Sequence, residues 1–360
     1  MTIGGRALSL GRIRIRVRRP DGVLRPAVLA AAGLAAVAVL VVVGVAVGSV
    51  AVAPGDTIGI LLRALGLPVE RTWSAAAETI VLELRLPRVL SAVVVGAGLA
   101  VAGATFQGLL RNPLADPYVL GTASGAALGA AIAVLLPVRV AILDLGLLNV
   151  LAFAGGLGAV AVVYRLGRGG PLAPLTGLLL TGYAVGSLLA AGLAMTMYLS
   201  GANLRQIFAF LLGGLEGSSW PRIAIAAPLV VGGSVAILAR ARALNGLLLG
   251  EEAAAHLGVD VRRERMVLLG LATLVTSAAV AISGLIGFVG LVAPHLVRLA
   301  VGPNARHVLP LAAILGAALL VGADLVARLL GEIPVGVVTA VVGAPFFLAL
   351  LRSARSGYEL

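Results

Sequence analysis

The side chains that could bind a metal ion or transfer a proton are few and scattered in this sequence. Three histidines, His256, His295 and His307, stand far apart in the chain, and a metal site would need them to converge with further ligands. An enzyme would also need a clustered nucleophile or acid–base pair, and none is visible. We therefore expect no metal site and no catalytic residues.

The residue types that are missing exclude further chemistry. Cysteine is absent, so disulfides, thiolate metal sites and cysteine nucleophiles are excluded. All 27 residues of the lysine and arginine class are arginine. A chain without lysine cannot supply the P-loop lysine that binds nucleotide phosphates. Any ATP and Mg²⁺ must be bound by a partner, and we expect no cofactor in this chain.

One short stretch concentrates charge. Residues 250–265, GEEAAAHLGVDVRRER, hold four acids and three arginines in a chain that is only 12% charged. Glu251 and Glu252 suit the first turn of a short surface helix, where negative charge complements the helix dipole. Gly258 would end that helix, and Asp260 would cap the next one. Small residues three or four positions apart leave one face open to another protein; a solvated loop is the alternative.

Three arginines near the ends of apolar stretches form a second group. Arg85 and Arg88 lie in LRLPR, just before one apolar stretch, and Arg328 lies near the end of another. Arginines in such places either extend to the membrane surface or pair with an acid. Glu83 and Asp324 are the candidate partners.

The composition indicates whether these residues belong to a soluble protein or to a membrane protein. Mean hydropathy is +1.11, and aromatic residues make up only 4% of the chain. These values are typical of a polytopic membrane protein and not of a soluble domain. A helix needs about 20 mostly apolar residues to cross a bilayer. We predict an all-α fold with about ten transmembrane helices, at residues 27–53, 89–110, 118–136, 147–164, 174–198, 222–240, 266–283, 285–301, 308–330 and 335–351.

The arginines also predict the orientation of the chain. With the N-terminus in the cytoplasm, 19 arginines lie inside and eight outside, as the positive-inside rule requires. An even number of spans returns the C-terminus to the cytoplasm. The net charge of +12 does not indicate nucleic acid, because the arginines flank apolar spans without interleaved aromatics. We predict an arginine-rich cytoplasmic segment (1–26), a transmembrane domain (27–352) with the charged helix inside residues 246–263, and a cytoplasmic tail (353–360).

Two external segments, 54–87 and 207–212, have helical patterning but are too polar or too short to span. The second is predicted to be a re-entrant half-helix, which is tolerated only where protein or a watery cavity covers it. A shift of 181 residues also aligns 97–114 with 278–295. This match is either chance in a chain rich in alanine, glycine and leucine or an internal repeat of the kind common in transporters.

Residues 250–258 fit the pattern G-E-x-x-A-x-x-L-G. This pattern resembles the coupling-helix motif of FecCD-type permeases, the membrane subunits of ATP-driven importers for iron chelates, haem and cobalamin. Further segments similar to that family follow in the expected order and together cover about residues 80–352. They are LRLPRVLSAVVVGAGLAVAGATFQGLLRNPLADPYVLGTASGA, SGLIGFVGLVAPHLVR, GPNARHVLP and EIPVGVVTAVVGAPFFLALL.

The resemblance implies a transporter subunit and not an enzyme, in the cytoplasmic membrane of a bacterium or archaeon. It implies a homodimer of permease chains in the lipid bilayer, two cytoplasmic ATPases that bind ATP and Mg²⁺, and an extracytoplasmic substrate-binding protein. The residues that it implies are Gly250, Glu251, Ala254, Leu257 and Gly258 for ATPase coupling, Arg85, Arg88 and Arg328 for docking of the binding protein, and Leu175 and Thr176 for the cytoplasmic gate.

The cargo is not determined by these residues. A ferric siderophore is the commonest cargo of the family, with cobalamin and haem as alternatives, and the spans are too uniformly aliphatic to separate the three. A secondary transporter driven by an ion gradient is the rival class. Such a transporter usually carries ionisable residues in mid-span, whereas nearly all charges here lie at span ends or in loops. We therefore predict ATP-driven import of a metal chelate, with a ferric siderophore as the first choice.

Overall fold

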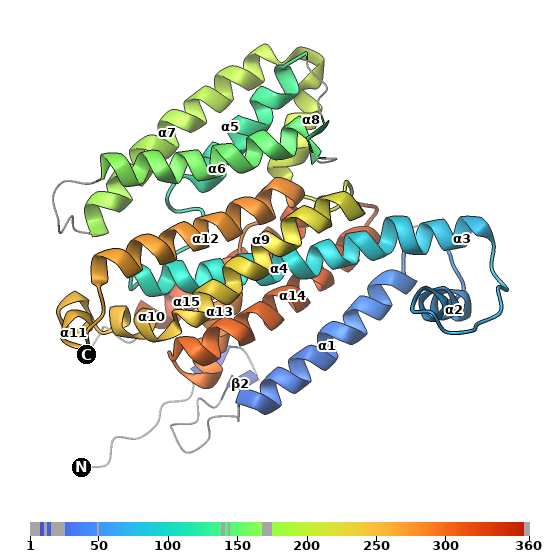
Figure 1. The fold of residues 1–360 in the computed structure, drawn as a ribbon, viewed down its shortest axis with the longest axis horizontal. Helices are drawn as coiled ribbons and strands as arrows, with labels where there is room; N and C mark the ends of the chain where they lie inside the picture. Colours follow the sequence, from blue (N-terminus) through green and yellow to red (C-terminus); the bar gives the residue numbers. More distant parts are fainter. Residues whose placement is uncertain are drawn as a thin grey trace.

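A computed structural model describes residues 8–10, 13–15, 26–48, 50–137, 141–142, 145–167 and 175–355. Long helices account for almost all of these residues (Figure 1). Two short antiparallel hairpins complete the described part, β1 (Leu8–Leu10) with β2 (Ile13–Ile15) and β3 (Ala141–Ile142) with β4 (Leu145–Gly146). The all-α prediction is confirmed.

The helices follow one another in the chain with short connections. The first group comprises α1 (Pro26–Ala46), α2 (Pro54–Ala64), α3 (Ala75–Thr79), the π-helical turn η2 (Ile80–Arg85), α4 (Leu86–Leu109), α5 (Thr122–Leu135), α6 (Leu147–Leu166) and α7 (Leu175–Leu199). The second comprises the 3₁₀ turn η3 (Gly201–Asn203), α8 (Leu204–Leu212), α9 (Trp220–Ala239), α10 (Ala241–Leu248), α11 (Glu251–His256), α12 (Val261–Ser283), α13 (Val289–Val301), α14 (Ala305–Leu329) and α15 (Val335–Arg355).

Each predicted span coincides with an apolar helix. Among the described residues, seven helices are long and apolar enough to cross a membrane: α1, the joined helix from α3 to α4, α6, α7, α9, α12 and α14. Three shorter apolar helices, α5, α13 and α15, occupy the remaining predicted positions. The polytopic architecture follows from these lengths and compositions.

The second span begins earlier than predicted. The helix is continuous from Ala75 to Leu109, whereas the sequence placed its start near residue 89. Pro87 lacks an amide hydrogen and would clash with the preceding turn of a regular α-helix. The wider π-helical turn η2 lies just before it and lets the helix continue. The predicted external segment is therefore partly an extension of this helix, and α2 forms the rest.

Helix α4 occupies the centre of the bundle. It contacts α9, α12, α13 and α14, and most of its residues are buried. A Cβ atom at Gly96 would overlap the Gly316 carbonyl oxygen of α14, and one at Gly103 would overlap the Gly290 carbonyl oxygen of α13. Only glycine therefore permits these crossings. Small residues at helix interfaces are the usual means of close packing where lipid supplies no hydrophobic drive.

The packing around α4 has a counterpart around α12. Helix α4 packs against α13 and α14, which follow α12 in the chain, and α12 packs against α5 and α6, which follow α4. Helices α4 and α12 also contact each other directly. This exchange of partners is the arrangement that an internal repeat requires, so the weak sequence repeat has a structural counterpart.

The apolar run predicted to be re-entrant forms the short helix α8. It ends at Gly213, whose φ of +66° favours glycine. The Gly214 amide donates to the Ser283 carbonyl at 2.8 Å, and the Gly336 amide donates to the Gly213 carbonyl at 3.1 Å. These bonds attach the end of α8 to the end of α12 and the start of α15. A half-helix at membrane depth needs protein partners of this kind.

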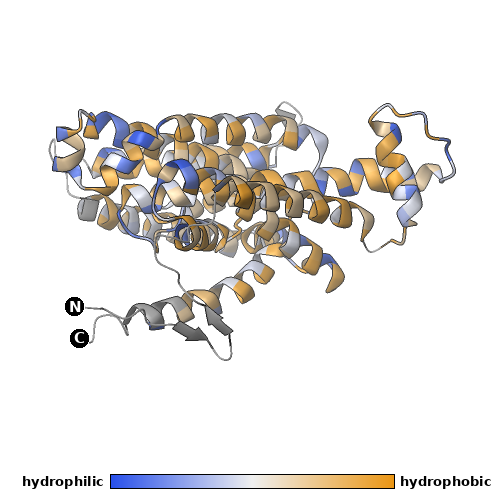
Figure 2. Cartoon of the chain, turned by 90° about the horizontal axis from the view of Figure 1, so that it is seen from below, coloured by the Kyte–Doolittle hydropathy of each residue, from blue (hydrophilic) through white to orange (hydrophobic). Residues whose placement is uncertain are grey.

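The bundle has two distinct ends. Helices α10 and α11 lie at one end, called the α11 end, and α2 and α3 lie at the other, called the α2 end (Figure 1). Figure 2 shows hydrophobic residues along the middle of the helices and hydrophilic residues gathered toward the ends. Helix α1 starts and α15 finishes at the α11 end.

Candidate functional site

The charged stretch folds into the two helices that its sequence predicts. Helix α11 starts directly after Gly250, whose φ is +113°, and is followed by Gly258, whose φ is +78°. Both residues occupy backbone conformations that other side chains disfavour. The Gly258 amide donates back into the last turn at 2.9 Å and ends the helix. The Asp260 carboxylate accepts a hydrogen bond from the Arg263 amide at 3.0 Å, which caps the start of α12 as predicted.

Two leucines are exposed beside α11. The exposed fractions of Leu249 and Leu257 are 70% and 66%. An open groove of about 580 Å³ runs between α10 and the start of α12, and both leucines line it. Its wall is also charged, with Arg242, Arg263 and Glu264 among the lining residues. Exposed apolar side chains beside charged ones are typical of a protein contact site.

Ala254 differs from the other motif residues in its surroundings. It is fully buried and lies next to Gly246 of α10. A Cβ atom added to Gly246 would lie 3.7 Å from the Cβ atom of Ala254. Ala254 therefore positions α11 on α10 and does not present a surface to a partner. The other four motif residues are exposed or half-buried; together with Leu249 they are called the α11 surface, which consists of Leu249, Gly250, Glu251, Leu257 and Gly258.

One ion pair connects the α11 surface with α12, and a second connects α12 with the end of α9. Glu251 pairs with Arg265 in the first turns of α12. Arg240, at the end of α9, pairs with Glu264 of α12 at 2.6 Å. All four side chains are partly exposed, so each pair contributes modestly to stability. Their geometric effect is to couple the position of α11 to α12 and, through α12, to α9.

The two predicted gate residues lie at the edge of what the structure describes. Leu175 and Thr176 form the start of α7, and their side chains lie outside the described residues. Their role as a gate stays a prediction.

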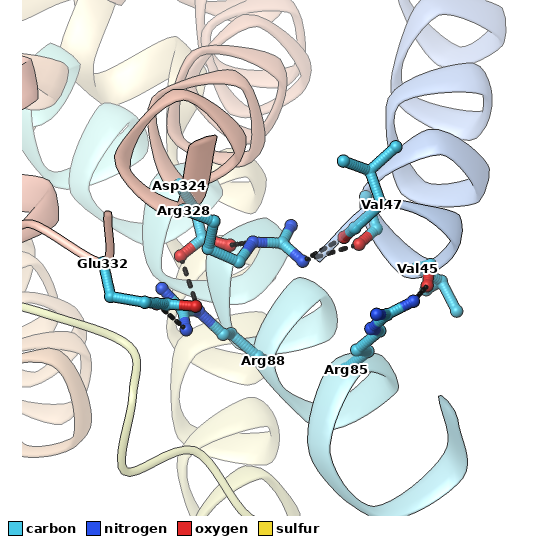
Figure 3. A network of polar contacts seen from close by, with 8 residues as sticks. Val45, Val47, Arg85, Arg88, Asp324, Arg328 and Glu332 are labelled. Atoms are coloured by element: carbon cyan, nitrogen blue, oxygen red, sulfur yellow. Dashed lines mark hydrogen bonds and ion pairs between the residues drawn. The ribbon is translucent and has the colours of Figure 1, made fainter. Parts of the chain in front are cut away.

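At the α2 end, two arginines and two acids form a cluster between α4 and α14 (Figure 3). Arg88 Nε donates to Asp324 Oδ1 at 2.8 Å, and Arg88 Nη1 donates to Glu332 Oε2 at 2.7 Å. Arg328 Nε lies 3.1 Å from Asp324 Oδ2, an ion pair without hydrogen-bond geometry. The predicted pairing with Asp324 is confirmed for Arg88 and Arg328. The cluster neutralises a carboxylate that is completely buried.

Arg85 and Arg328 hold the end of α1 (Figure 3). Arg85 Nη1 donates to the carbonyls of Val45 and Ala46 at 3.1 and 2.8 Å, not to Glu83. Arg328 Nη1 donates to the carbonyls of Gly44 and Val47 at 2.7 and 2.9 Å. The last carbonyls of a helix lack partners within the helix and form the negative end of its dipole. Both arginines therefore act as caps of α1, and each is only 6% exposed.

A polar contact between the last turns of α4 and α13 was not predicted. Arg298 of α13 donates to the Gln107 side chain and, at 3.1 Å, to the Ala104 carbonyl. Gln107 in turn donates to the Leu291 carbonyl at 3.3 Å. These bonds connect α4 with α13. The one signal in the sequence was an arginine and a glutamine placed within apolar helices, where polar side chains need partners.

The histidines do not form a common site. His256 lies in α11, His295 in α13 and His307 in α14. In the part of the chain that the structure describes, no three histidine, aspartate or glutamate side chains gather in a way that could hold a metal ion.

Sequence comparisons place this architecture among known permeases. A profile of the FecCD transport family matches residues 36–353. The cobalamin import system permease protein BtuC of Halobacterium salinarum is 47% identical over 290 residues, which cover 80% of this chain and 78% of the relative. The hemin transport system permease protein HmuU of Yersinia pestis is 42% identical over 306 residues, 82% of this chain and 91% of the relative.

A structural comparison agrees. A solved structure described as an inward-facing conformation of a metal-chelate type ABC transporter covers 91% of this chain and 100% of its own, with a TM-score of 0.78 and 30% identity. The PsaBC complex from Streptococcus pneumoniae shares the fold more distantly, with a TM-score of 0.53 and 19% identity over 73% of this chain and 88% of its own. The family profile, the relatives and the shared fold together show that the chain belongs to the FecCD transport family.

Proposed function

We propose that this chain is the membrane-spanning permease of an ATP-binding-cassette importer. It works with two ATPase subunits and an extracytoplasmic substrate-binding protein. The observation that carries the proposal is the α11 surface, which presents two exposed leucines. An ion pair joins this surface to α12, and a second ion pair joins α12 to α9. The chain lacks lysine, so the partners bind ATP and Mg²⁺, and the permease itself is not an enzyme.

The α11 surface suits the transmission of force. An ATPase that holds Leu249 and Leu257 would move α11 when it closes on ATP. The Glu251–Arg265 pair would pass that movement to α12, and the Arg240–Glu264 pair would pass it to α9. Helix α12 contacts α4, α5, α6 and α9. A small displacement at the surface would therefore shift much of the bundle, as in other transporters that rock packed helices against each other.

The two ends of the bundle indicate which face of the membrane each partner approaches. The α11 end faces the cytoplasm together with both termini, and the α2 end faces the outside, in the cytoplasmic membrane of a bacterium or archaeon. Two copies of the chain enclose the pathway, and Leu175 and Thr176 narrow its cytoplasmic exit. Among the three arginines that the resemblance assigns to docking, Arg88 is the least buried, so we assign the contact with an acidic lobe of the binding protein to Arg88.

The cargo belongs to the class of metal chelates. Relatives named for cobalamin and hemin transport match this chain, and the Fe(3+) dicitrate transport system permease protein FecD of Escherichia coli is 40% identical over 288 residues, 79% of this chain and 89% of the relative. The names of these relatives do not show which of these chelates this chain transports. We keep a ferric siderophore as the first candidate, and the identity to a cobalamin permease makes cobalamin the alternative to test beside it.

The ATPase contact is tested with Leu257→Arg. The substitution places a charge on the exposed centre of the α11 surface and leaves buried Ala254 untouched. We expect the variant to lose copurification with its ATPase while the permease keeps its elution profile in gel filtration. Leu65→Arg is the matched control, because Leu65 is 79% exposed at the α2 end. Equal recovery of the ATPase with both variants would contradict the proposed contact.

A further inference from the structure

A second groove opens in the membrane-spanning part of the chain, away from the α11 surface. It has a volume of about 250 Å³ and lies between α9 and α14, with α4 as its floor. Almost its whole wall is apolar, and Ser234 is the one lining side chain with a polar group. The residues that define it are Val94 and Ala97 of α4, Val231 and Val235 of α9, and Pro310 and Ala313 of α14.

The groove opens sideways, toward the surroundings of the bundle. Val231 and Val235 are 55% and 59% exposed on helix α9. Exposed valines on a membrane-spanning helix face lipid tails, because lipid is the solvent there. The groove offers no cluster of donors or charges that would hold a polar chelate. An aliphatic chain is the ligand whose chemistry matches these walls.

An arginine stands at the α11 end of the same groove. Arg306 precedes Pro310 by one turn of α14 and Ala313 by two turns, so the three residues share one stripe of the helix. Its side chain is exposed and has no ion-pair partner within the described residues. Arg240 and Arg265, two other arginines of this end, are paired with acids. Arg242 and Arg263 have no ion pair among the described residues, but they line the groove beside α11 and not the apolar groove. Arg306 therefore presents an uncompensated positive charge where the apolar groove reaches the membrane surface.

We propose that this groove binds an anionic phospholipid of the surrounding bilayer. One acyl chain lies against α4 between α9 and α14, and the guanidinium of Arg306 pairs with the headgroup phosphate. Basic residues beside clefts between transmembrane helices bind anionic headgroups in this way. The site is independent of the proposed transport function, since it requires only that the chain spans a membrane.

The test uses the full chain in lipid nanodiscs with a trace of photoreactive lipid. The probe carries a diazirine in one acyl chain and is made in two forms, phosphatidylglycerol and phosphatidylcholine. After illumination, mass spectrometry of peptides locates the label. We expect phosphatidylglycerol to label residues 230–238 and 309–313 above all other lipid-facing segments.

Two substitutions separate the headgroup from the acyl chain. Arg306→Gln should reduce the preference for phosphatidylglycerol over phosphatidylcholine about fivefold, the ratio expected for one basic residue at an anionic lipid surface. Val235→Trp fills the groove and should remove its labelling by both probes. The controls are Arg165→Gln, at an exposed arginine of α6 on the same end, and Val341→Trp, at an exposed valine of α15 outside the groove. Neither control should change the labelling.

The outcomes decide between the possible occupants. Label spread evenly over the exposed helices, unchanged by Val235→Trp, would overturn the acyl-chain site. Groove labelling with an unchanged lipid preference in Arg306→Gln would overturn the headgroup contact. Cross-links from the groove to a second copy of the chain would show that protein covers it and would likewise overturn the proposal. Gel filtration of each variant verifies that the chain remains folded.

Discussion

Arg88 and Asp324 are separated by 236 positions in the chain, yet their side chains meet at 2.8 Å at the α2 end. The Asp324 side chain is completely buried and that of Arg88 is 12% exposed. The pair fixes α4 to α14, and Arg328 adds a second positive charge to the same carboxylate. An acidic partner that docks here would have to compete with Asp324 and Glu332 for Arg88.

Removal of the buried acid should destabilise the bundle strongly. Asp324→Ala leaves Arg88 and Arg328 without their shared counter-ion, and loss of one partner of a buried ion pair costs about 3–5 kcal/mol. We expect a clear fall in the thermal unfolding midpoint of the detergent-solubilised chain. Glu332→Gln, at a side chain that is 36% exposed, should have a much smaller effect. Equal midpoints for the two variants would show that the buried pair is not the main anchor.

The arginines at the α2 end should separate into two roles. Arg88→Glu should abolish the stimulation of ATPase activity by the loaded binding protein, because it reverses the charge that an acidic lobe would approach. It should also lower the thermal midpoint, because it places a third acid beside Asp324 and Glu332. Arg85→Gln should instead lower the thermal midpoint, because it leaves carbonyls at the end of α1 without donors. Arg71→Gln is a surface control, since that side chain is 45% exposed. Full stimulation in Arg88→Glu proteoliposomes would refute the docking role.

The glycine crossings should tolerate no side chain. Gly103→Ala places a methyl group against the Gly290 backbone, and overpacking of this kind typically costs about 1–3 kcal/mol. We expect a lower thermal midpoint and weaker packing of α4 on α13. Gly322→Ala is the control within a helix, because no atom lies within 4 Å of the added Cβ. The prediction fails if both alanine variants unfold at the wild-type temperature.

The helices and their order were predictable from the sequence because bilayer thickness imposes a minimum apolar length. The ends of α11 were predictable as well, since glycine and acidic residues mark helix termini locally. Asp260 likewise marks the start of α12, where its carboxylate accepts a hydrogen bond from the Arg263 amide. All of these signals lie within a few residues of the feature that they mark.

The contacts between distant residues were not predictable in the same way. The caps that Arg85 and Arg328 provide for α1 depend on helices far apart in the chain. The burial of Ala254 depends on how α10 folds back on α11. In helices that are apolar on every side, periodicity does not reveal which face meets protein and which meets lipid. The apolar groove between α9 and α14 and the crossing at Gly103 therefore appear only in the structure.

ATP-driven import of a chelate is tested by uptake into proteoliposomes that contain this chain, its ATPase and its loaded binding protein. ATP is enclosed inside, and labelled ferric siderophore or cobalamin is supplied outside. We predict that one of these chelates accumulates only when ATP is present and that Leu257→Arg prevents it. Accumulation that does not depend on ATP and follows an imposed ion gradient would contradict ATP-driven import.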